Sequence, residues 1–479
     1  MLSYCCIYLL FASFWIPVSC FANFKSSCDV CIIGGGVSGL SSAVQLPNDT
    51  KTILVEAQSK LGGRVSSESI DGFTLNLGFA VFIDEYPESK AIFDYDELQL
   101  AAFQPGALIK RKGEGLARIA DPLRQPTRLL DAILSPVGTV FDKVRLVPLL
   151  LHVQSKNISQ LFDDDETDVY TCLKSKYGFS DKMIQEFFQP FFEGIFFCPL
   201  KEQSSRMFHF VFKMFSEGRA TLPTGGMQAV ANQLCERARN KGIEIRLDSP
   251  VSRLKKGDDG MYKIMLKDGG EIEAKSIICA TEGTTARQLL STLPELKVLS
   301  ELEDQPERSV GCMYYKLAGD APVKEAILIL NGEGAMDGSI NNVCFPSIVN
   351  PSYAREGYHL CSVAIDGRMM TKYEGREEEL DQVVRQALGE WFPEYKDDIQ
   401  SEWELLRTYR IHRAQPAQLF GPMPANVYGG RPCNMYRDIF LPSGLFVSGD
   451  YMNTASLNGA LESGKLAAIA TSKFLQPIS

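Results

Sequence analysis

The stretch CDVCIIGGGVSGLSSAVQL, residues 28–46, decides the fold because an apolar run enters a glycine cluster and continues as a helical pattern. A short run that is apolar on both faces is typical of a central strand in a parallel sheet. The helical pattern ends before Pro47, and KTILVEA, residues 51–57, predicts a second strand that Glu56 closes. We therefore expect a strand, turn, helix and strand in that order over residues 28–57.

The glycines of this unit have the G-x-G-x-x-G spacing of a dinucleotide-binding turn. In such a turn the first glycine makes the bend, the second lets a pyrophosphate approach the backbone, and the third lets helix and strand pack closely. The positive helix N-terminus favours phosphate, and an acid at the end of the second strand binds ribose, which suits FAD or NAD rather than NADP. The predicted cofactor contacts here are Gly34, Gly36, Val37, Ser38, Gly39, Glu56 and Ala57.

Charge and histidine content argue against two classes of function. The chain has 479 residues, and 49 basic against 59 acidic side chains give a net charge of −10. Because we find no basic stripe, we expect no nucleic-acid partner. No histidine lies at metal-ligand spacing from cysteines or carboxylates along the chain, so we expect no metal. The four histidines are His152, His209, His359 and His412.

The first twenty residues contain no charged side chain and predict a cleaved signal peptide over residues 1–20. Val18 and Cys20 are small enough for the third-last and last positions before the cut. A short membrane anchor is the alternative, although the run is brief for a membrane span. After the cut, FANFKSS resembles the two-part plastid leaders of algae with secondary plastids.

The cysteines favour a reducing compartment. Three of the 13 lie in the predicted leader, and the other ten show no disulfide-framework spacing. We therefore expect entry into the secretory route followed by transfer to a reducing compartment such as a plastid. The endoplasmic reticulum and the extracellular space are the alternatives.

The segment LGGRVSSESIDGFTLNLG, residues 61–78, resembles the flavin amine oxidase superfamily, which includes amine oxidases, protoporphyrinogen oxidase and phytoene desaturase-like carotenoid enzymes. The resemblance implies an FAD cofactor. It also implies that Gly62 and Gly63 pass along the FAD pyrophosphate, with Arg64 as its cation. Gly78 would let the chain approach the flavin ring.

Two later clusters resemble the phytoene desaturase-like branch. PTGGMQAVANQL, residues 223–234, matches the return of the chain to the FAD domain, and Val251 matches an adenine-side backbone contact. In SGDYMNTASLNGALESG, residues 448–464, the matching aspartate binds the ribityl chain and a helix N-terminus stabilises negative charge on reduced flavin. The contacts carried over from this last cluster are Gly449, Asp450, Leu457, Asn458 and Gly459.

The resemblance implies an α/β fold with a Rossmann-like FAD-binding domain of the GR2 type and a discontinuous α+β substrate domain. The FAD-binding domain would combine residues 28–104, 221–286 and 406–475, and the substrate domain would combine residues 105–220 and 287–405. One departure stands out: family members usually have proline after Ala-Thr, where this chain has Glu282.

Three departures separate the chain from true amine oxidases. Gly311 stands where their flavin-side lysine is expected, with Lys316 five residues later, and Ser456 replaces one aromatic wall of their amine cage. Their flavin-linking cysteine motif is absent near RIHRAQPAQ, and Cys433 comes too late. We therefore expect non-covalent FAD and a substrate other than a small amine.

The substrate half is rich in phenylalanine, which we expect mostly in core packing and in part around a hydrophobic substrate tunnel. Residues 129–153 predict a membrane-contact region or lid, with a packed helix pair as the alternative. We predict an FAD-dependent oxidoreductase that dehydrogenates an apolar carotenoid or porphyrinogen, with oxygen or a quinone as electron acceptor. A non-redox isomerase or hydratase using reduced FAD, or an amine oxidase, is the alternative. We assign no catalytic residue.

Overall fold

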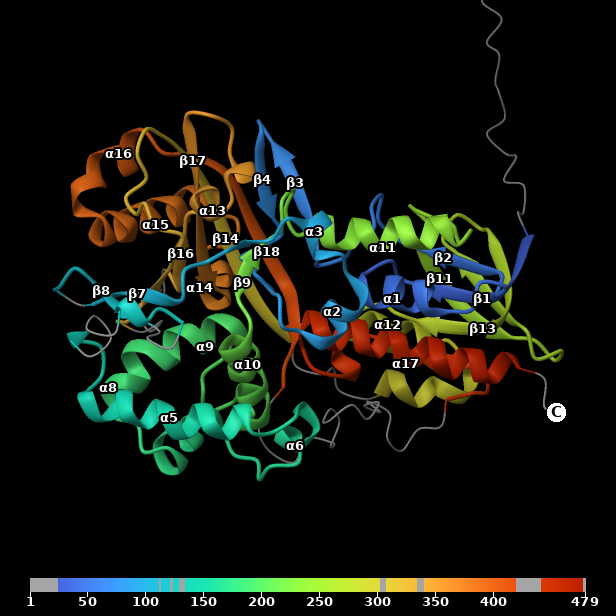
Figure 1. Cartoon of the computed structure of the whole chain (residues 1–479). Helices are drawn as coiled ribbons and strands as arrows, with labels where there is room; N and C mark the ends of the chain where they lie inside the picture. The colour runs from blue at the N-terminus through green and yellow to red at the C-terminus, as the bar shows by residue number, and fades with distance from the viewer. Residues whose placement is uncertain are drawn as a thin grey trace, which may run out of the picture.

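The computed structural model describes residues 25–111, 113–120, 124–128, 134–301, 307–333, 340–418 and 441–476. Two seven-stranded sheets dominate these residues, and Figure 1 shows them in different halves of the molecule. The first sheet is on the right in that view and carries the glycine turn. The second is on the left, with helices above and below it. The predicted leader, residues 1–20, lies outside the described residues.

The first sheet contains the predicted strand, turn, helix and strand. Strands β10, β2, β1 and β13 lie side by side in parallel, and β19 also runs parallel to β13. β11, β12 and β13 form an antiparallel meander, with Gly269 at φ +91° in the turn between β12 and β13. The strands are β1 (Lys25–Ile33), β2 (Thr52–Val55), β10 (Glu244–Arg246), β11 (Val251–Lys256), β12 (Tyr262–Leu266), β13 (Glu271–Cys279) and β19 (Leu445–Val447).

Both faces of this sheet are buried, as an apolar β1 predicts. Val30 and Ile32 belong to the core formed with helices α1 (Val37–Gln45), α11 (Gln228–Asn240) and α17 (Leu457–Leu475). Cys31 and Ile33 belong to the core on the other face, which includes α12 (Gly283–Leu290). Successive side chains of a strand point to opposite faces, so each face receives its own apolar set. The predicted α/β fold class is confirmed.

The second sheet has the order β18, β14, β17, β16, β15, β7, β8 and is antiparallel except between β15 and β7. Its strands are β7 (Gly106–Lys110), β8 (Leu116–Ala120), β14 (Glu307–Ala318), β15 (Leu328–Asn331), β16 (Asn342–Cys344), β17 (Tyr358–Asp366) and β18 (Glu404–Pro416). The predicted FAD-domain segment beginning at residue 406 therefore starts inside β18, which pairs with β14 in this sheet.

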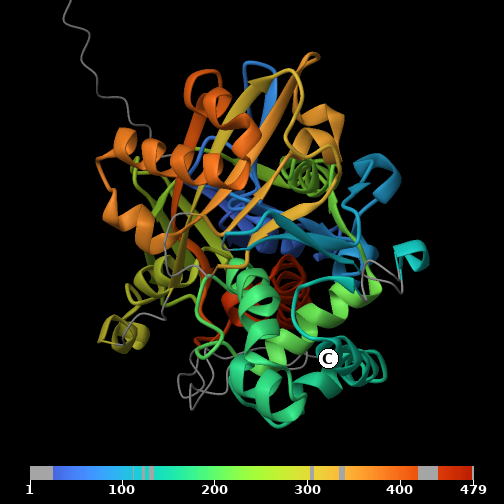
Figure 2. The same cartoon turned by 90° about the vertical axis from the view of Figure 1, so that its left-hand side faces the viewer.

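Helices cover the second sheet in two groups, which Figure 2 shows in orange and in green on opposite sides of it. The orange group comprises α13 (Pro346–Val349), α14 (Gly367–Lys372), α15 (Glu377–Trp391) and α16 (Lys396–Ser401). The green group comprises α5 (Val140–Gln154), α6 (Ile158–Phe162), α7 (Val169–Thr171), α8 (Asp181–Met183), α9 (Gln189–Phe196) and α10 (Ser205–Glu217).

Most of the phenylalanines form packed core within the green group. Phe188, Phe192 and Phe208 have no exposed surface and contact one another at ring distances of 4.7–6.3 Å. Others, such as Phe187 and Phe191, are partly buried against the same cluster. Core packing is thus the main role of this aromatic segment, as expected for more than half of it.

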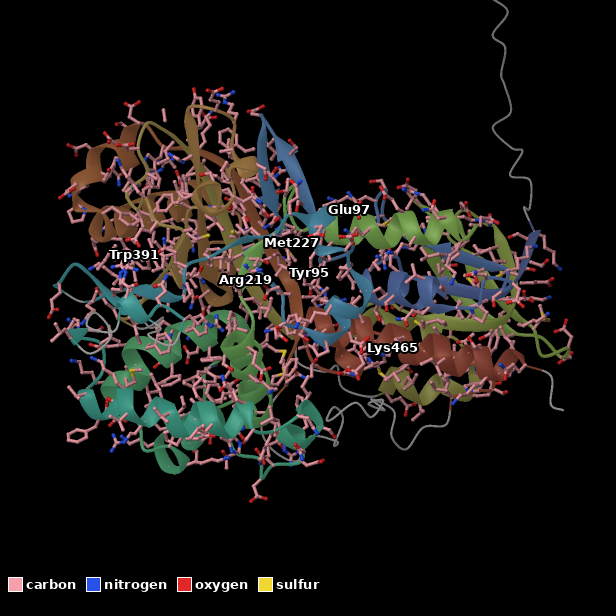
Figure 3. The ribbon with its side chains drawn as sticks, in the orientation of Figure 1. Tyr95, Glu97, Arg219, Met227, Trp391 and Lys465 are labelled. Carbon is pink, nitrogen blue, oxygen red and sulfur yellow. The ribbon has the colours of Figure 1, made fainter. Side chains whose placement is uncertain are left out.

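Short elements connect the two halves. Arg219, which Figure 3 labels between them, donates from its backbone N and its Nε to Asp84, at 2.6 and 2.7 Å. Lys465 on α17 pairs with Glu88 on α2 at 2.5 Å. These connecting elements are β3 (Ser67–Ile70), β4 (Phe73–Asn76), β5 (Phe82–Ile83), α2 (Pro87–Ile92), α3 (Tyr95–Leu98), β6 (Ala101–Ala102) and β9 (Ala220–Leu222).

Candidate cofactor site

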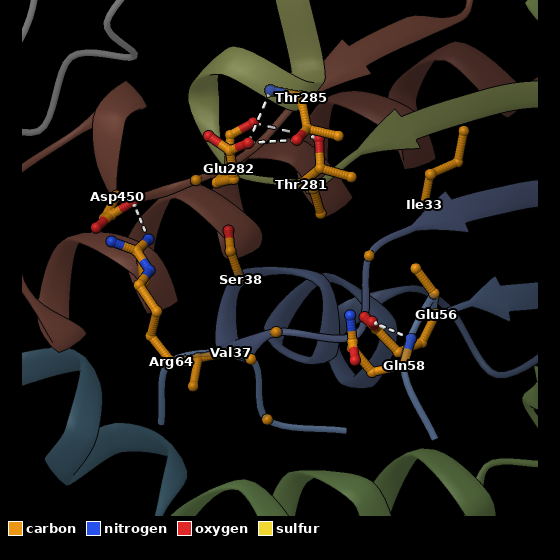
Figure 4. Close-up of a pocket in the computed structure, with 18 of the residues that line it drawn as sticks. Ile33, Val37, Ser38, Glu56, Gln58, Arg64, Thr281, Glu282, Thr285 and Asp450 are labelled. Carbon is orange, nitrogen blue, oxygen red and sulfur yellow. Dashed lines mark hydrogen bonds and ion pairs between the residues drawn. The ribbon is translucent and has the colours of Figure 1, made fainter. Parts of the chain in front are cut away.

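The glycine turn after β1 opens into a cavity of about 630 Å³. Segments that are hundreds of residues apart line it together, and Figure 4 shows Glu56 and Arg64 at opposite sides of the view. Thirteen of the seventeen predicted cofactor contacts line this cavity: Gly34, Gly36, Val37, Ser38, Glu56, Ala57, Gly62, Gly63, Arg64, Val251, Gly449, Asp450 and Leu457.

The glycines of the first turn have distinct surroundings. A Cβ at Gly39 would lie 1.9 Å from the Gly34 carbonyl oxygen, so this position demands glycine for close helix–strand packing. A Cβ at Gly36 would meet nothing within 4 Å, because that position borders open cavity. Gly36 is also the N-cap of α1 and offers no side chain to the first backbone N–H groups of the helix. Those groups are therefore available to a phosphate.

Glu56 is held in place at the end of β2. Its Oε2 accepts a hydrogen bond from the Gly35 backbone N at 2.6 Å, and its Oε1 accepts one from the Gln58 backbone N at 2.8 Å. Both bonds fix the carboxylate beside the glycine turn. An acid in this position is placed to receive ribose hydroxyls.

The second glycine pair joins the first turn directly. Gly62 donates its backbone N–H to the Gly35 carbonyl at 2.9 Å, and Gly62 and Gly63 both have positive φ. This turn delivers Arg64 to the cavity, where its Nη2 contacts Asp450 Oδ1 at 2.7 Å and its Nη1 donates to the Ala414 carbonyl at 2.9 Å. The contact between Arg64 and Asp450 brings the first and third predicted clusters together.

Four predicted contacts lie outside the lining of this cavity. Besides Gly39, they are Gly78, Asn458 and Gly459. The Gly78 carbonyl accepts a hydrogen bond from the Tyr314 hydroxyl at 3.1 Å, which ties it to the second sheet. Asn458 Oδ1 accepts from the Glu88 backbone N at 3.0 Å, and Gly459 donates its N–H to Ser456 Oγ at 3.1 Å. Their cofactor contacts stay predictions.

Several lining residues were not assigned from the sequence. They come from the end of β13, the start of α12 and the end of β18, and include Thr281, Glu282, Thr285, Arg413, Ala414 and Gln415. The only sequence signal was Glu282 in the usual place of a proline. The others have no motif of their own. Thr281 and Thr285 reach the cavity after β13, and Arg413, Ala414 and Gln415 reach it on β18, which pairs with β14.

The positions that differ from amine oxidases are engaged in other contacts where the structure describes them. A Cβ at Gly311 would lie 2.2 Å from Met370 Sδ, so Met370 fills the space of a side chain there. Lys316 points elsewhere and pairs with Glu404 at 2.7 Å. Ser456 caps α17 through its hydroxyl. Cys433 lies outside the described residues, so non-covalent attachment of FAD stays a prediction.

Two histidines and one carboxylate lie together although no spacing along the chain indicates it, and the expected absence of a metal stays a prediction. His152 Nε2 lies 2.7 Å from Asp164 Oδ2, and His209 Nδ1 lies 4.0 Å from the same oxygen. Folding brings these residues of α5, α10 and the loop after α6 together. Lys156 contacts Asp164, and Lys176 Nζ lies 3.4 Å from His152 Nε2, so a bound cation would face two ammonium groups.

The cavity as a whole fits a flavin dinucleotide. Open backbone at Gly36 and the α1 N-terminus suit a pyrophosphate, and Arg64 supplies a cation beside it. Glu56 suits ribose, while Val251 and Leu289 offer apolar surface to an aromatic base.

The chain is similar to known proteins in sequence and in fold. The profile of the family described as flavin containing amine oxidoreductase matches residues 37–470. A 15-cis-phytoene desaturase of Capsicum annuum is 26% identical over 298 residues, 58% of this chain and 51% of the relative. A mitochondrial protoporphyrinogen oxidase of Nicotiana tabacum is 30% identical over 139 residues, 29% of this chain and 27% of the relative.

Among solved structures, an oxidoreductase from Methanosarcina mazei has a TM-score of 0.65 at 20% identity, covering 93% of this chain and 100% of that one. This likeness shows a shared fold. The chain spans about half the length of the phytoene desaturase that it matches.

We expect two neighbouring glycines to behave differently when each is changed to alanine. Gly39→Ala should destabilise the protein by about 1–3 kcal/mol, because its Cβ would overlap the Gly34 carbonyl oxygen. Gly36→Ala should leave the stability of the FAD-free protein unchanged, yet weaken FAD binding about tenfold or more by filling the open backbone. Urea unfolding and flavin fluorescence measure the two effects. Equal loss of stability in both variants would contradict the assignment.

Proposed function

This chain belongs to the flavin containing amine oxidoreductase family and is an FAD-dependent oxidoreductase, and we propose that it dehydrogenates an uncharged apolar substrate such as a carotenoid or a porphyrinogen. When bound, FAD supplies the acceptor for a hydride from a substrate C–H bond. We propose oxygen or a quinone as the final electron acceptor. The relatives with desaturase and protoporphyrinogen oxidase names support this substrate class.

One observation carries the choice against amines. The position of the expected flavin-side lysine is Gly311, which has no side chain, and a Cβ there would meet Met370. The cage position is Ser456, which is engaged in capping α17. A cationic amine would lose its hydration without gaining an aromatic face at that position. An apolar substrate has no such cost and gains free energy from burial.

The chain's own residues bind and orient in this proposal. Arg64 and the α1 N-terminus hold the pyrophosphate, and Glu56 holds the ribose. Asp450 is itself fixed by Arg64 at 2.7 Å.

We expect amines to leave the bound flavin oxidised under anaerobic conditions. Benzylamine and a polyamine should give negligible bleaching of the flavin absorbance, whereas a polyene or a porphyrinogen should bleach it in a saturable manner. Stopped-flow absorbance of the purified holoenzyme measures this. Fast, saturable reduction by an amine would refute the proposal. Conversion of a carotenoid only after prior flavin reduction, with no net electron transfer, would instead indicate an isomerase or hydratase.

We also propose that the enzyme works at the surface of a membrane, with α5 as the contact. Val140, Val144, Val147 and Leu151 recur at helical spacing and, together with Phe141, are each at least 53% exposed. The opposite face of α5 carries the buried residues Leu149 and Val153. An exposed apolar stripe of this size marks an interaction surface. No helix in the described part of the chain is long and apolar enough to cross a membrane.

The charges around α5 fit a lipid surface. Lys143 and Arg145 lie on the helix between the exposed apolar residues, and Lys182 lies close enough to lower the pKa of Lys143, after the larger effect of burial. Basic side chains beside an apolar stripe favour an interface with anionic lipids. The opposite face of α5 packs against α10, as the packed-helix alternative expects, while this stripe stays exposed.

The double variant Phe141→Ser, Val144→Ser should bind anionic lipid vesicles about tenfold or more weakly, because burying each side chain contributes more than about 1.4 kcal/mol. Vesicle flotation of the purified protein measures this. Val298→Ser, which removes a single exposed apolar residue elsewhere, is the control and should bind normally. Equal binding of wild type and double variant would contradict the proposal.

We propose a plastid as the compartment, reached through the secretory route. The phytoene desaturase relatives carry chloroplastic names, and all nine cysteines of the described residues are buried and unpaired. Such thiols suit a reducing compartment. We expect mass spectrometry of the mature protein to find an N-terminus near Phe21 or further along the chain, because the leader is removed first. An intact Met1 would contradict the predicted cleavage and favour a membrane anchor.

A further inference from the structure

Two glutamates and one arginine form a cluster at the wall of the FAD cavity. Glu282 is the N-cap of α12 and accepts hydrogen bonds from the Thr284 and Thr285 backbone N atoms, both at 2.9 Å. Arg413 on β18 bridges the two acids, with Nη1 at 2.5 Å from Glu282 Oε1 and Nε at 3.0 Å from Glu307 Oε2. Glu307 begins β14, so three elements supply the three side chains.

The cluster borders the place where the residues suit a pyrophosphate. Glu282 and Arg413 line the cavity together with Gly36, Ser38 and Arg64. Figure 4 shows the Glu282 carboxylate above Ser38 in the view. Glu307 lines a small adjoining pocket that it shares with Arg64 and Asp450. A negative ligand in the cavity is therefore close to this cluster.

The cluster has one cation for two carboxyl groups. Burial, together with the neighbouring Glu282 carboxylate, raises the pKa of Glu307 to about 7 against the opposing effect of Arg413. Burial also acts against the charged form of Glu282, yet the hydrogen bonds from Thr285 and the charge of Arg413 hold its pKa below the usual value. The proton of the pair therefore lies mainly on Glu307.

We propose that the Glu282–Arg413–Glu307 cluster controls the affinity of the cavity for FAD through one proton on Glu307. With that proton the cluster is neutral. Without it the cluster carries a net charge of −1 beside the pyrophosphate of the cofactor. The pyrophosphate keeps its negative charge throughout the neutral range, so only the cluster changes.

The direction of the pH dependence follows from the linkage between FAD binding and protonation of Glu307. Affinity is highest while Glu307 is protonated, below about pH 7, and falls as the pH rises through the pKa of Glu307. Bound pyrophosphate, being negative, holds the proton more tightly, so FAD binding takes up a fraction of a proton in this range. The steepest possible loss is about tenfold per pH unit for a single coupled proton.

The other groups facing Glu307 do not supply this proton. They are the Thr284 hydroxyl at 3.3 Å from α12 and Arg413 from β18, with the Arg64–Asp450 pair across the adjoining pocket. An arginine stays charged at these pH values. His412 precedes Arg413 on β18 and is exposed, and it is the histidine that a control must test.

The test measures FAD release from the holoenzyme, without substrate. Holoenzyme is diluted into buffers from about pH 6 to about pH 8.5, and free FAD is measured by its fluorescence to give a dissociation constant at each pH. We expect the wild-type constant to rise several-fold or more over this range. Glu307→Gln should give a flat profile at the tight, low-pH value, because the amide cannot ionise.

Three further variants keep the outcome unambiguous. Glu282→Gln should move the inflection of the dissociation constant to lower pH, because Glu307 is then the only carboxylate of the cluster paired with Arg413. Glu202→Gln, which changes an acid paired with Arg308 at 2.7 Å next along β14, and His412→Gln should both keep the wild-type profile. A flat wild-type profile, an unchanged slope in Glu307→Gln or a flat profile in His412→Gln would overturn the proposal. Because no substrate is used, these outcomes are independent of the proposed dehydrogenation.

Discussion

The close approach of α1 to its neighbours is the constraint on which the cofactor cavity depends. A Cβ at Gly39 would overlap the Gly34 carbonyl oxygen, and a Cβ at Gly464 on α17 would lie 2.3 Å from the Ser38 carbonyl oxygen. The contact between Gly39 and Gly34 sets α1 against the turn after β1, and the contact between Gly464 and Ser38 sets α17 against α1. Because protein interiors are close-packed, an added methyl at either place would move the helix whose N-terminus faces the cavity.

Charge balance inside the cavity follows from that packing. Glu56 is held by two backbone N–H groups, Asp450 by Arg64, and Glu282 by the N-terminus of α12 and Arg413. Each acid thus has a partner before any ligand arrives, which limits repulsion of a pyrophosphate. Glu307 is the exception, since it shares its cation with Glu282, and this surplus carboxyl is what gives the cavity a titratable group near neutral pH.

Strand β18 is the physical link between the two halves of the enzyme. It pairs with β14 in the second sheet, and its final residues reach the cavity of the first, where the Ala414 carbonyl accepts a hydrogen bond from Arg64. The substrate half contributes little aromatic surface to that cavity, because its phenylalanines pack mainly against one another. Most of its exposed large apolar residues lie instead on α5, at the molecular surface.

The sequence alone determined the parallel strands, the glycine turn and the cofactor class, because these depend on local periodicity and on fixed spacing between near neighbours. Glu56 was found in the same way, whereas Arg64, Asp450 and the choice of FAD followed from the resemblance of short motifs to a known family. Only the tertiary structure decided that β18 belongs to the second sheet, that His152 and His209 meet Asp164, and that Glu307 shares Arg413 with Glu282. Such contacts join residues tens to hundreds of positions apart, and their partners are chosen by how whole sheets and helices pack rather than by any neighbour along the chain.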